Sequence, residues 1–341
     1  MPITEHTIKT ERHTTFYLAA GPENGPLVIF VHGWPELSIS WEHQLSALAA
    51  LGFRTIAPDM RGYGRSSVYS QHSAYAQEHI VRDMLELLDA MGREKAVWVG
   101  HDWGSPVVWN LASHHPDRCH AVASLCAPYY TLERGLDQLL SLVNRELYPE
   151  NEFPVGPWDY MYYYEENVAE AIAPMDANVS RFMRRLLRKG DPAGEGKPAF
   201  TATARRNHSF LGGHEIPDLP PDTDVVTEET LSMYVSALER NGFAGPAFWY
   251  LNDRTNASYA STALNGGYLD LPVLFFNARY DYVSECTHSR LAEPMRTYCL
   301  QFTEEMIRSG HWMAQEKPVE VNAALVKWLA TKVPEVWPQP K

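Results

Sequence analysis

The sequence predicts an α/β fold: a mostly parallel eight-stranded sheet with helices on both faces and an inserted helical lid. Short runs that are apolar throughout, as in buried parallel strands, alternate with stretches whose apolar residues recur at helical spacing. This alternation stops between about residues 130 and 264 and then resumes. A chain of 341 residues is long enough for one large domain with such an insertion.

The eight predicted strands fall into two groups. Two alternating stretches near the start, 6–10 and 13–20, predict an antiparallel hairpin. The other six strands are the apolar runs at 27–31, 53–58, 96–100, 121–126, 271–276 and 300–307. Helical patterns separate them, as at 41–52 and 78–92, and the second of these places on one face Ile80, Met84, Leu87, Leu88 and Met91. Strands joined in this way form a parallel sheet that helices cover on both faces.

The insertion divides the chain into three parts. It is rich in helix formers, prolines and aromatic residues and contains no strand–helix unit. We therefore expect residues 1–129 and 265–341 to form the core and residues 130–264 to form the lid. A lid at this place would cover the carboxyl ends of the strands, where such sheets bind their ligands.

Composition narrows the class of protein. The formal net charge of -13 repels phosphates, so a nucleic-acid partner is not expected. The four cysteines have no metal-binding spacing and resemble small buried hydrophobes of a reducing compartment. The first 20 residues lack a signal-peptide pattern, and the apolar runs are too short to cross a bilayer. We expect a cytoplasmic protein without membrane insertion, metal or cofactor, as a monomer or a homodimer.

The stretch GHDWG, residues 100–104, has the form of a nucleophile elbow in which an aspartate replaces the usual serine. It follows the predicted strand 96–100 directly and precedes a helical pattern, which is the strand–turn–helix context that an elbow requires. Its glycines suit a tight turn that leaves no room for a Cβ. The alternative is a glycine-bearing turn with a solvent-facing acid. The context favours Asp102 as a nucleophile.

Two later residues complete a triad with Asp102. Asp281 follows the strand 271–276, and His311 follows the last strand. Both lie just past strand ends, so their loops can converge on one cleft. The order nucleophile, acid, histidine is the one found in the α/β-hydrolase fold. With 14 histidines in the chain, it is this position after the final strand that selects His311.

A second turn predicts an oxyanion hole. HGWP, residues 32–35, follows the first parallel strand, and a cis bond before Pro35 would aim the Trp34 backbone N–H into the cleft. The N–H of Trp103, directly after the nucleophile, is the expected second donor.

These motifs together resemble those of the α/β-hydrolase-fold epoxide hydrolases. The similarity runs through HGWP, DMRGYGRS at 59–66, GHDWG, ARYDYV and SGHW in this order, and it spans nearly the whole chain. The segments 159–171 and 242–252 are similar to the lid segments that supply this family's two tyrosines, here Tyr160 and Tyr250. We expect no N-terminal phosphatase-like domain of the kind that some vertebrate members carry, because the sequence resembles the single-module forms of microbes and plants.

The resemblance implies a reaction. The two phenols would donate hydrogen bonds to the oxygen of a small apolar epoxide while Asp102 attacks a ring carbon. Water activated by His311, which Asp281 orients, would then hydrolyse the ester to a vicinal diol. The expected pocket is formed by aromatic side chains, namely Trp34, Trp103, Tyr163, Tyr164 and Trp312.

The sequence gives less support to three other functions. A haloalkane or haloacid dehalogenase can use the same Asp–His–Asp triad, but Trp34 stands where such enzymes often carry Asn. Fluoroacetate-type dehalogenases usually carry Arg in place of Trp103. A catalytically silent binding protein on this fold tends to lose part of the triad, which is complete here. A serine hydrolase would need a serine in the elbow.

Overall fold

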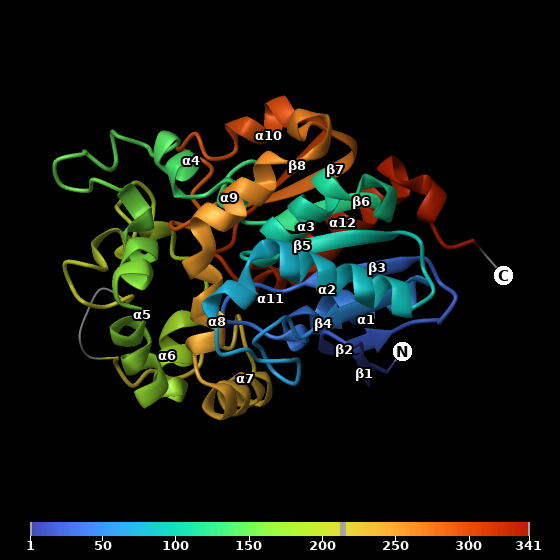
Figure 1. Ribbon diagram of the computed structural model, residues 1–341, viewed down its shortest axis with the longest axis horizontal. Coiled ribbons are helices and arrows are strands. Elements are labelled where there is room, and N and C mark those ends of the chain that lie inside the picture. Colours follow the sequence, from blue (N-terminus) through green and yellow to red (C-terminus); the bar gives the residue numbers. More distant parts are fainter. Residues whose placement is uncertain (1, 212–215, 340–341) are drawn as a thin grey trace.

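The computed structural model describes residues 2–211 and 216–339 and contains one eight-stranded sheet (Figure 1). The strands lie in the order β1-β2-β4-β3-β5-β6-β7-β8. Their bounds are β1 Thr4–Lys9, β2 Thr14–Ala20, β3 Leu27–Val31, β4 Arg54–Pro58, β5 Ala96–His101, β6 Cys119–Leu125, β7 Leu269–Ala278 and β8 Cys299–Ile307. The pairs β1–β2 and β2–β4 are antiparallel, and all others are parallel. The predicted hairpin and the six predicted parallel strands are thus confirmed.

Helices cover both faces of the sheet. Helices α1 (Glu42–Ala50) and α12 (Pro318–Lys332) pack on one face. Helices α2 (Gln77–Ala90) and α3 (Gly104–His114) pack on the other. The alternation along β3 divides the core, because Val28 and Phe30 contact the first layer while Ile29 and Val31 contact the second. The short helices α10 (Glu293–Tyr298) and α11 (Met313–Glu316) flank β8 in the chain.

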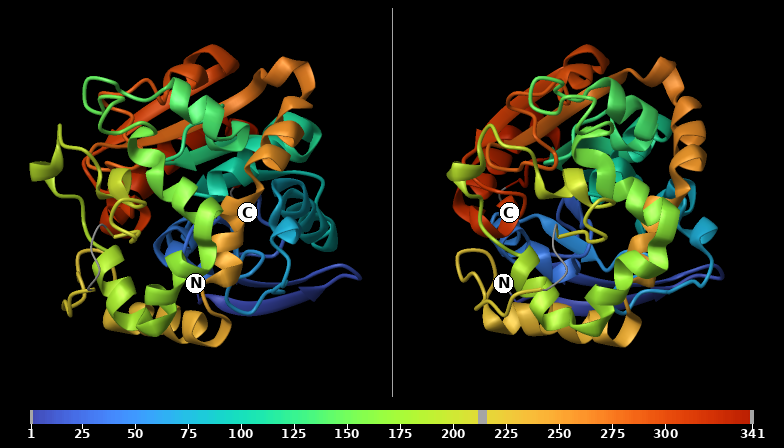
Figure 2. Two further views of the ribbon diagram at one scale, coloured as in Figure 1. Left: turned by 60° about the vertical axis from the view of Figure 1, so that its left-hand side comes forward. Right: turned by 90° about the vertical axis from the view of Figure 1, so that its left-hand side faces the viewer.

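The segment between β6 and β7 folds as a helical insertion. It contains α4 Leu136–Ser141, α5 Asp159–Ala177, α6 Val179–Leu186, α7 Glu228–Asn241, α8 Ala244–Phe248 and α9 Asp253–Ser261. None of the residues described in this segment belongs to a strand. Figures 1 and 2 show α5 to α8 gathered at one end of the sheet, while α9 lies beside α3. Because β6 and β7 are neighbouring parallel strands, the insertion leaves the core at the carboxyl end of β6 and returns to the amino end of β7 at the opposite edge of the sheet.

The motif DMRGYGRS joins the insertion to the core. The guanidinium of Arg61 donates two hydrogen bonds of 2.7 Å to the buried carboxylate of Asp83 on α2. This pair fixes the backbone of Arg61, whose carbonyl accepts a 3.0 Å hydrogen bond from the indole Nε1 of Trp249. Trp249 precedes Tyr250, so the motif helps to hold one of the predicted lid tyrosines.

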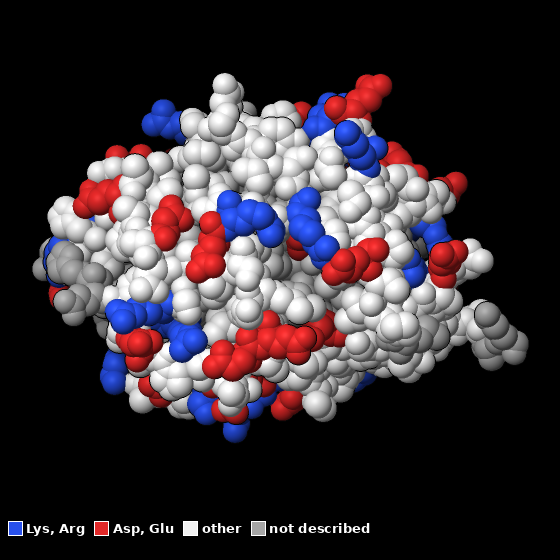
Figure 3. Space-filling view, turned by 90° about the horizontal axis from the view of Figure 1, so that it is seen from below, with Lys and Arg blue, Asp and Glu red and all other residues white. Residues whose placement is uncertain are grey.

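Each of the four cysteines is buried and free. No helix among the described residues is long and apolar enough to cross a membrane. On the face shown in Figure 3, acidic side chains form a continuous band below the middle, while basic side chains are scattered over the face.

Candidate active site

The elbow has the predicted geometry. Strand β5 ends at His101, α3 begins at Gly104, and Asp102 between them has a φ of 50°. This left-handed conformation is unfavourable for a residue with a side chain, and it raises the carboxylate above the strand ends. A Cβ on Gly104 would lie 2.1 Å from the carbonyl oxygen of Val31. Only glycine therefore allows the close packing of helix and strand at this position.

The turn after β3 binds one oxygen of Asp102. The backbone N–H of Trp34 donates a 2.7 Å hydrogen bond to Oδ1, and the Trp34–Pro35 bond is cis, as the sequence predicts. A Cβ on Gly33 would lie 2.5 Å from this carboxylate, so glycine is needed there too. Trp103 directly precedes α3, where backbone N–H groups are free of intrahelical partners.

His311 lies between two carboxylates. Its Nδ1 is 2.6 Å from Oδ2 of Asp281, and its Nε2 is 3.5 Å from Oδ2 of Asp102. The other oxygen of Asp281 accepts two backbone hydrogen bonds of 3.1 Å, from Val283 and Ser284. The structure thus brings together the three residues that the sequence selects. The carboxylate oxygen that faces the imidazole is not the one that Trp34 holds.

The charges of the triad are coupled. Burial would lower the pKa of His311, but the carboxylates of Asp281 and Asp102 raise it well above its usual value. The pKa of Asp281 is lowered, because His311 and two backbone N–H groups outweigh the effect of burial. The carboxylates around His311 therefore favour its protonated, cationic form.

A second buried ion pair lies beneath the triad, and the sequence patterns did not single it out. Nδ1 of His101 is 2.6 Å from Oε2 of Glu36, and its Nε2 is 2.8 Å from the carbonyl oxygen of His311. Both partners are acceptors, so both ring nitrogens carry hydrogens and His101 is an imidazolium. The other oxygen of Glu36 accepts a 2.7 Å hydrogen bond from Gln315. His101 stands inside GHDWG and Glu36 directly follows HGWP, and this proximity to the motifs was the available signal.

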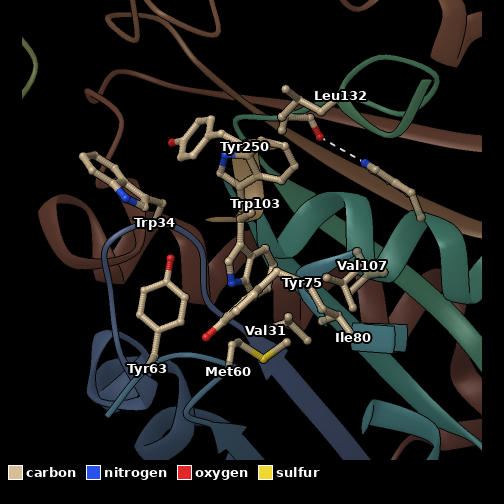
Figure 4. Packing of buried hydrophobic residues seen from close by; sticks show 14 of the residues in the cluster. Val31, Trp34, Met60, Tyr63, Tyr75, Ile80, Trp103, Val107, Leu132 and Tyr250 are labelled. Atoms are coloured by element: carbon tan, nitrogen blue, oxygen red, sulfur yellow. Dashed lines mark hydrogen bonds between the residues drawn. The ribbon is translucent and has the colours of Figure 1, made fainter. Parts of the chain in front are cut away.

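Two tyrosines of the insertion face the nucleophile. Tyr160 on α5 and Tyr250, just after α8, line the same cavity as Asp102, and their rings are 5.7 Å apart. Burial first, and then the charge of Asp102, raise the pKa of Tyr160 well above its ordinary value. Burial does the same for Tyr250. Both phenols therefore stay protonated and can donate. Figure 4 shows Tyr250 beside Trp103 and across from Trp34.

The cavity has a volume of about 400 Å³, within the range of small-molecule sites. Trp34 and Trp312 line it, as predicted. Trp103, Tyr163 and Tyr164 are not among its lining residues, so this part of the predicted pocket needs correction.

The rings of Tyr164 and Trp103 pack behind the cavity wall instead of lining it. The ring of Tyr164 stacks on Tyr250 at 4.7 Å, and the ring of Trp103 meets Tyr250 edge-on at 4.9 Å. These side chains support Tyr250 from behind. Tyr163 lies near Glu170, and burial together with that charge raises its pKa to about 12.

One group of potential metal ligands occurs among the described residues: His101, Cys126 and His311. Its histidine nitrogens are engaged, since His101 binds Glu36 and the carbonyl of His311, and Nδ1 of His311 binds Asp281. The donor set therefore serves the ion pairs of the site.

Comparison with known proteins identifies the class. Residues 26–318 match the family model of the alpha/beta hydrolase fold. The chain is 35% identical to epoxide hydrolase A of Mycobacterium tuberculosis, over 96% of this chain and 97% of that protein. It is 34% identical to bifunctional epoxide hydrolase 2 of Sus scrofa over 90% of the chain, but it spans only 52% of that longer relative.

Comparison with solved structures identifies the same class of protein. The crystal structure of epoxide hydrolase A from Mycobacterium thermoresistibile matches with a TM-score of 0.79 and 32% identity, over 97% of this chain and 99% of that one. An epoxide hydrolase from an endophytic Streptomyces matches with a TM-score of 0.77 and 30% identity, over 96% of this chain and 95% of that one. The chain therefore belongs to the epoxide hydrolases of the α/β-hydrolase fold.

Proposed function

We propose that this protein hydrolyses epoxides to vicinal diols through a covalent ester on Asp102. The observation that carries the proposal is the arrangement around that carboxylate. Trp34 binds one of its oxygens at 2.7 Å, while the other oxygen stays near His311 in a cavity that two buried phenols also line. At 3.5 Å from the imidazole nitrogen, this oxygen is held loosely enough to attack a ring carbon.

In the first step, Oδ2 of Asp102 attacks one ring carbon, and the C–O bond of the epoxide breaks. Tyr160 and Tyr250 donate hydrogen bonds to the epoxide oxygen, which takes up the electron pair. The proton that this oxygen finally gains comes from the His311 imidazolium, relayed through the phenols or water. The step leaves a neutral hydroxyalkyl ester and a neutral His311, so charge and protons balance.

In the second step, His311 removes a proton from water, and the hydroxide formed attacks Cγ of Asp102. Oδ1 then carries the negative charge of the tetrahedral intermediate, where Trp34 already donates and Trp103 is the second donor. Collapse breaks the bond between Cγ and Oδ2, so the diol leaves with Oδ2 and takes up the proton of the added hydroxyl. The water oxygen remains in the regenerated carboxylate, and His311 remains an imidazolium for the next cycle. Asp281 holds the ring in the orientation that both proton transfers need.

Trapping the ester tests the proposal. We expect His311→Gln to react with an epoxide such as styrene oxide and to keep the adduct, because the water step is disabled. Peptide mass spectrometry should place the added mass on Asp102. The control is Asp102→Asn in the same background, which should stay unmodified. A folded His311→Gln variant without an adduct, beside a native enzyme that turns the epoxide over, would refute the covalent mechanism.

The proposal also covers the domain boundaries and the cellular location of the protein. We propose residues 130–264 as the lid, between core parts at 1–129 and 265–341, because the helices of the insertion carry both tyrosines. A cytoplasmic location remains a prediction from composition, and localisation of a tagged chain in its cells of origin would test it.

A further inference from the structure

The chain that leaves α6 lies against both loops that carry the acid and the histidine of the triad. We call this segment, residues 186–191, the α6 exit. The carbonyl of Leu186 accepts a 3.0 Å hydrogen bond from the indole Nε1 of Trp312, which directly follows the triad histidine. The carbonyl of Asp191 accepts a 2.5 Å hydrogen bond from the phenol of Tyr282, which directly follows the triad acid. The insertion therefore contacts both catalytic loops through residues next to the reacting ones.

Glu316 joins the α6 exit to the loop of the histidine. Its Oε2 accepts a 3.0 Å hydrogen bond from the backbone N–H of Gly190 and a 2.7 Å hydrogen bond from that of Gly310. Glu316 is half-buried at the end of α11, and Gly310 directly precedes His311. A single carboxylate oxygen thus binds a residue of the insertion and the backbone of the triad loop at once.

The two glycines allow this shared contact. A Cβ on Gly310 would lie 2.6 Å from the backbone nitrogen of Gly190, and a Cβ on Gly190 would clash with the backbone of Ser309 and Gly310. A side chain at either position would push the two segments apart. Because both positions lack a Cβ, the backbones approach closely enough for one oxygen to reach both N–H groups.

The backbone on the other side of the imidazole is held by the core. The carbonyl of His311 is hydrogen-bonded to Nε2 of His101 at 2.8 Å and to Sγ of Cys126 at 3.2 Å. Both partners are buried, at the end of β5 and directly after β6. The sheet therefore fixes the loop after the imidazole, whereas the N–H of Gly310 before it is held by Glu316.

We propose that Glu316 is a positioning residue, which places the His311 imidazole through Gly310 and ties that loop to the α6 exit. This inference rests on the proposed function and assigns a residue to its second step. In that step Nε2 must reach the water that attacks Cγ of Asp102, and a misplacement of about 1 Å can cost about 10²-fold in rate. The first step should be less sensitive, because the attacking oxygen belongs to Asp102 and the proton of His311 arrives through a relay.

Single turnovers with styrene oxide measure the two steps separately. Rapid quenching followed by intact-protein mass spectrometry gives the rate at which the ester forms and the rate at which it is hydrolysed. We expect Glu316→Ala to slow ester hydrolysis about tenfold or more and to leave ester formation within about twofold of native. The fraction of enzyme held as ester in the steady state should rise accordingly. A variant that merely contained less folded protein would not raise that fraction.

Three further variants isolate the bridge. Glu316→Gln keeps an acceptor oxygen without the charge, so it should hydrolyse the ester at least about threefold faster than the alanine variant. Gly190→Ala pushes the α6 exit away from Gly310 and should slow hydrolysis in the same way with Glu316 intact. The matched control is Glu320→Ala, which removes the same charge from an exposed position on α12 and should behave as the native enzyme.

The outcomes separate this inference from the proposed function. Native-like ester hydrolysis in Glu316→Ala, or equal slowing of both steps, would overturn the inference and leave the epoxide hydrolase intact. So would a Glu316→Gln variant as slow as the alanine variant, or a Gly190→Ala variant as fast as the native enzyme. If Glu316→Ala does not fold, the hydrolysis rate of Gly190→Ala decides. A native enzyme that forms no ester with an epoxide that it hydrolyses would overturn the proposed mechanism, and the inference with it.

Discussion

Removing His101 should destabilise the fold, because it leaves the Glu36 carboxylate buried without its cation. We propose His101→Leu as the perturbation and His101→Leu/Glu36→Gln as its partner. Both side chains are only 1% exposed, and Gln315 is the remaining donor to the carboxylate. Breaking a buried pair by removing one member typically costs 3–5 kcal/mol, roughly, in free energy of unfolding.

The pKa of Glu36 gives an independent magnitude. Burial alone would raise this pKa, but the His101 imidazolium lowers it from 4.5 to about 2. At 1.36 kcal/mol per pH unit, this difference corresponds to about 3 kcal/mol. Burial would lower the pKa of His101, and Glu36 instead raises it from 6.5 to about 10. The two arguments agree on a loss of about 3–5 kcal/mol for His101→Leu.

The direction of each pKa shift determines how the stabilisation by the Glu36–His101 pair depends on pH. Glu36 has a depressed pKa, so its contribution is full above pH 4.5 and is lost as pH falls towards 2. His101 has a raised pKa, so its contribution is full below pH 6.5 and is lost as pH rises towards 10. The pair therefore stabilises the protein most between pH 4.5 and 6.5.

Urea unfolding followed by tryptophan fluorescence measures these effects. We expect the single variant to lose about 3–5 kcal/mol, and the double variant, which buries no unpaired charge, to recover at least half of that loss. A single variant that loses less than about 1 kcal/mol would refute the reasoning, since that is the size of an exposed pair. So would a double variant that is no more stable than the single one.

Three other predictions follow from the site. Tyr160→Phe and Tyr250→Phe should each slow ester formation by about 10²-fold, which is the usual cost of losing one such donor, and the double variant should slow it further. Stopped-flow single turnovers measure this rate. An unaffected rate would mean that the phenols only pack. Native ester formation should show no tyrosine ionisation up to pH 10, because the pKa values of both phenols are raised, and a falling rate near pH 10 in the same assay would contradict this. Gly104→Ala should lower the free energy of unfolding in urea by about 3 kcal/mol or more, because the added Cβ meets a backbone carbonyl. Gly92→Ala is the control: no atom lies within 4 Å of its added Cβ, so it should cost only backbone strain of about 1 kcal/mol. Similar losses for the two variants would contradict the packing argument.

Most of the fold could be predicted because its signals are local. The run at 27–31 is apolar at every position, and so short an apolar run is typical of a strand buried on both faces. The triad could be predicted for a related reason, since the carboxyl ends of parallel strands meet at one edge. Asp102, Asp281 and His311 each follow such an end, so their order along the chain carries spatial information.

The remaining features depend on packing that no local pattern records. Helical spacing places Tyr164 on the same face as Tyr160, but it does not tell which ring lines the cavity and which stacks behind Tyr250. Glu36 and His101 are 65 positions apart in the chain and meet only when their loops close over the same site.

The two carboxylates around His311 explain how one imidazole can first supply and then remove a proton. Before attack, both charges stabilise the imidazolium. Esterification neutralises Asp102, and the pKa of His311 must fall because one of its two anionic partners is lost. The nucleophile thus generates the base for the second step by reacting. Asp102→Asn mimics the neutral ester, so NMR titration should show a lower His311 pKa in this variant than in the native enzyme. An unchanged pKa would mean that Asp281 alone sets the charge of the ring, and that another group must switch it between the steps.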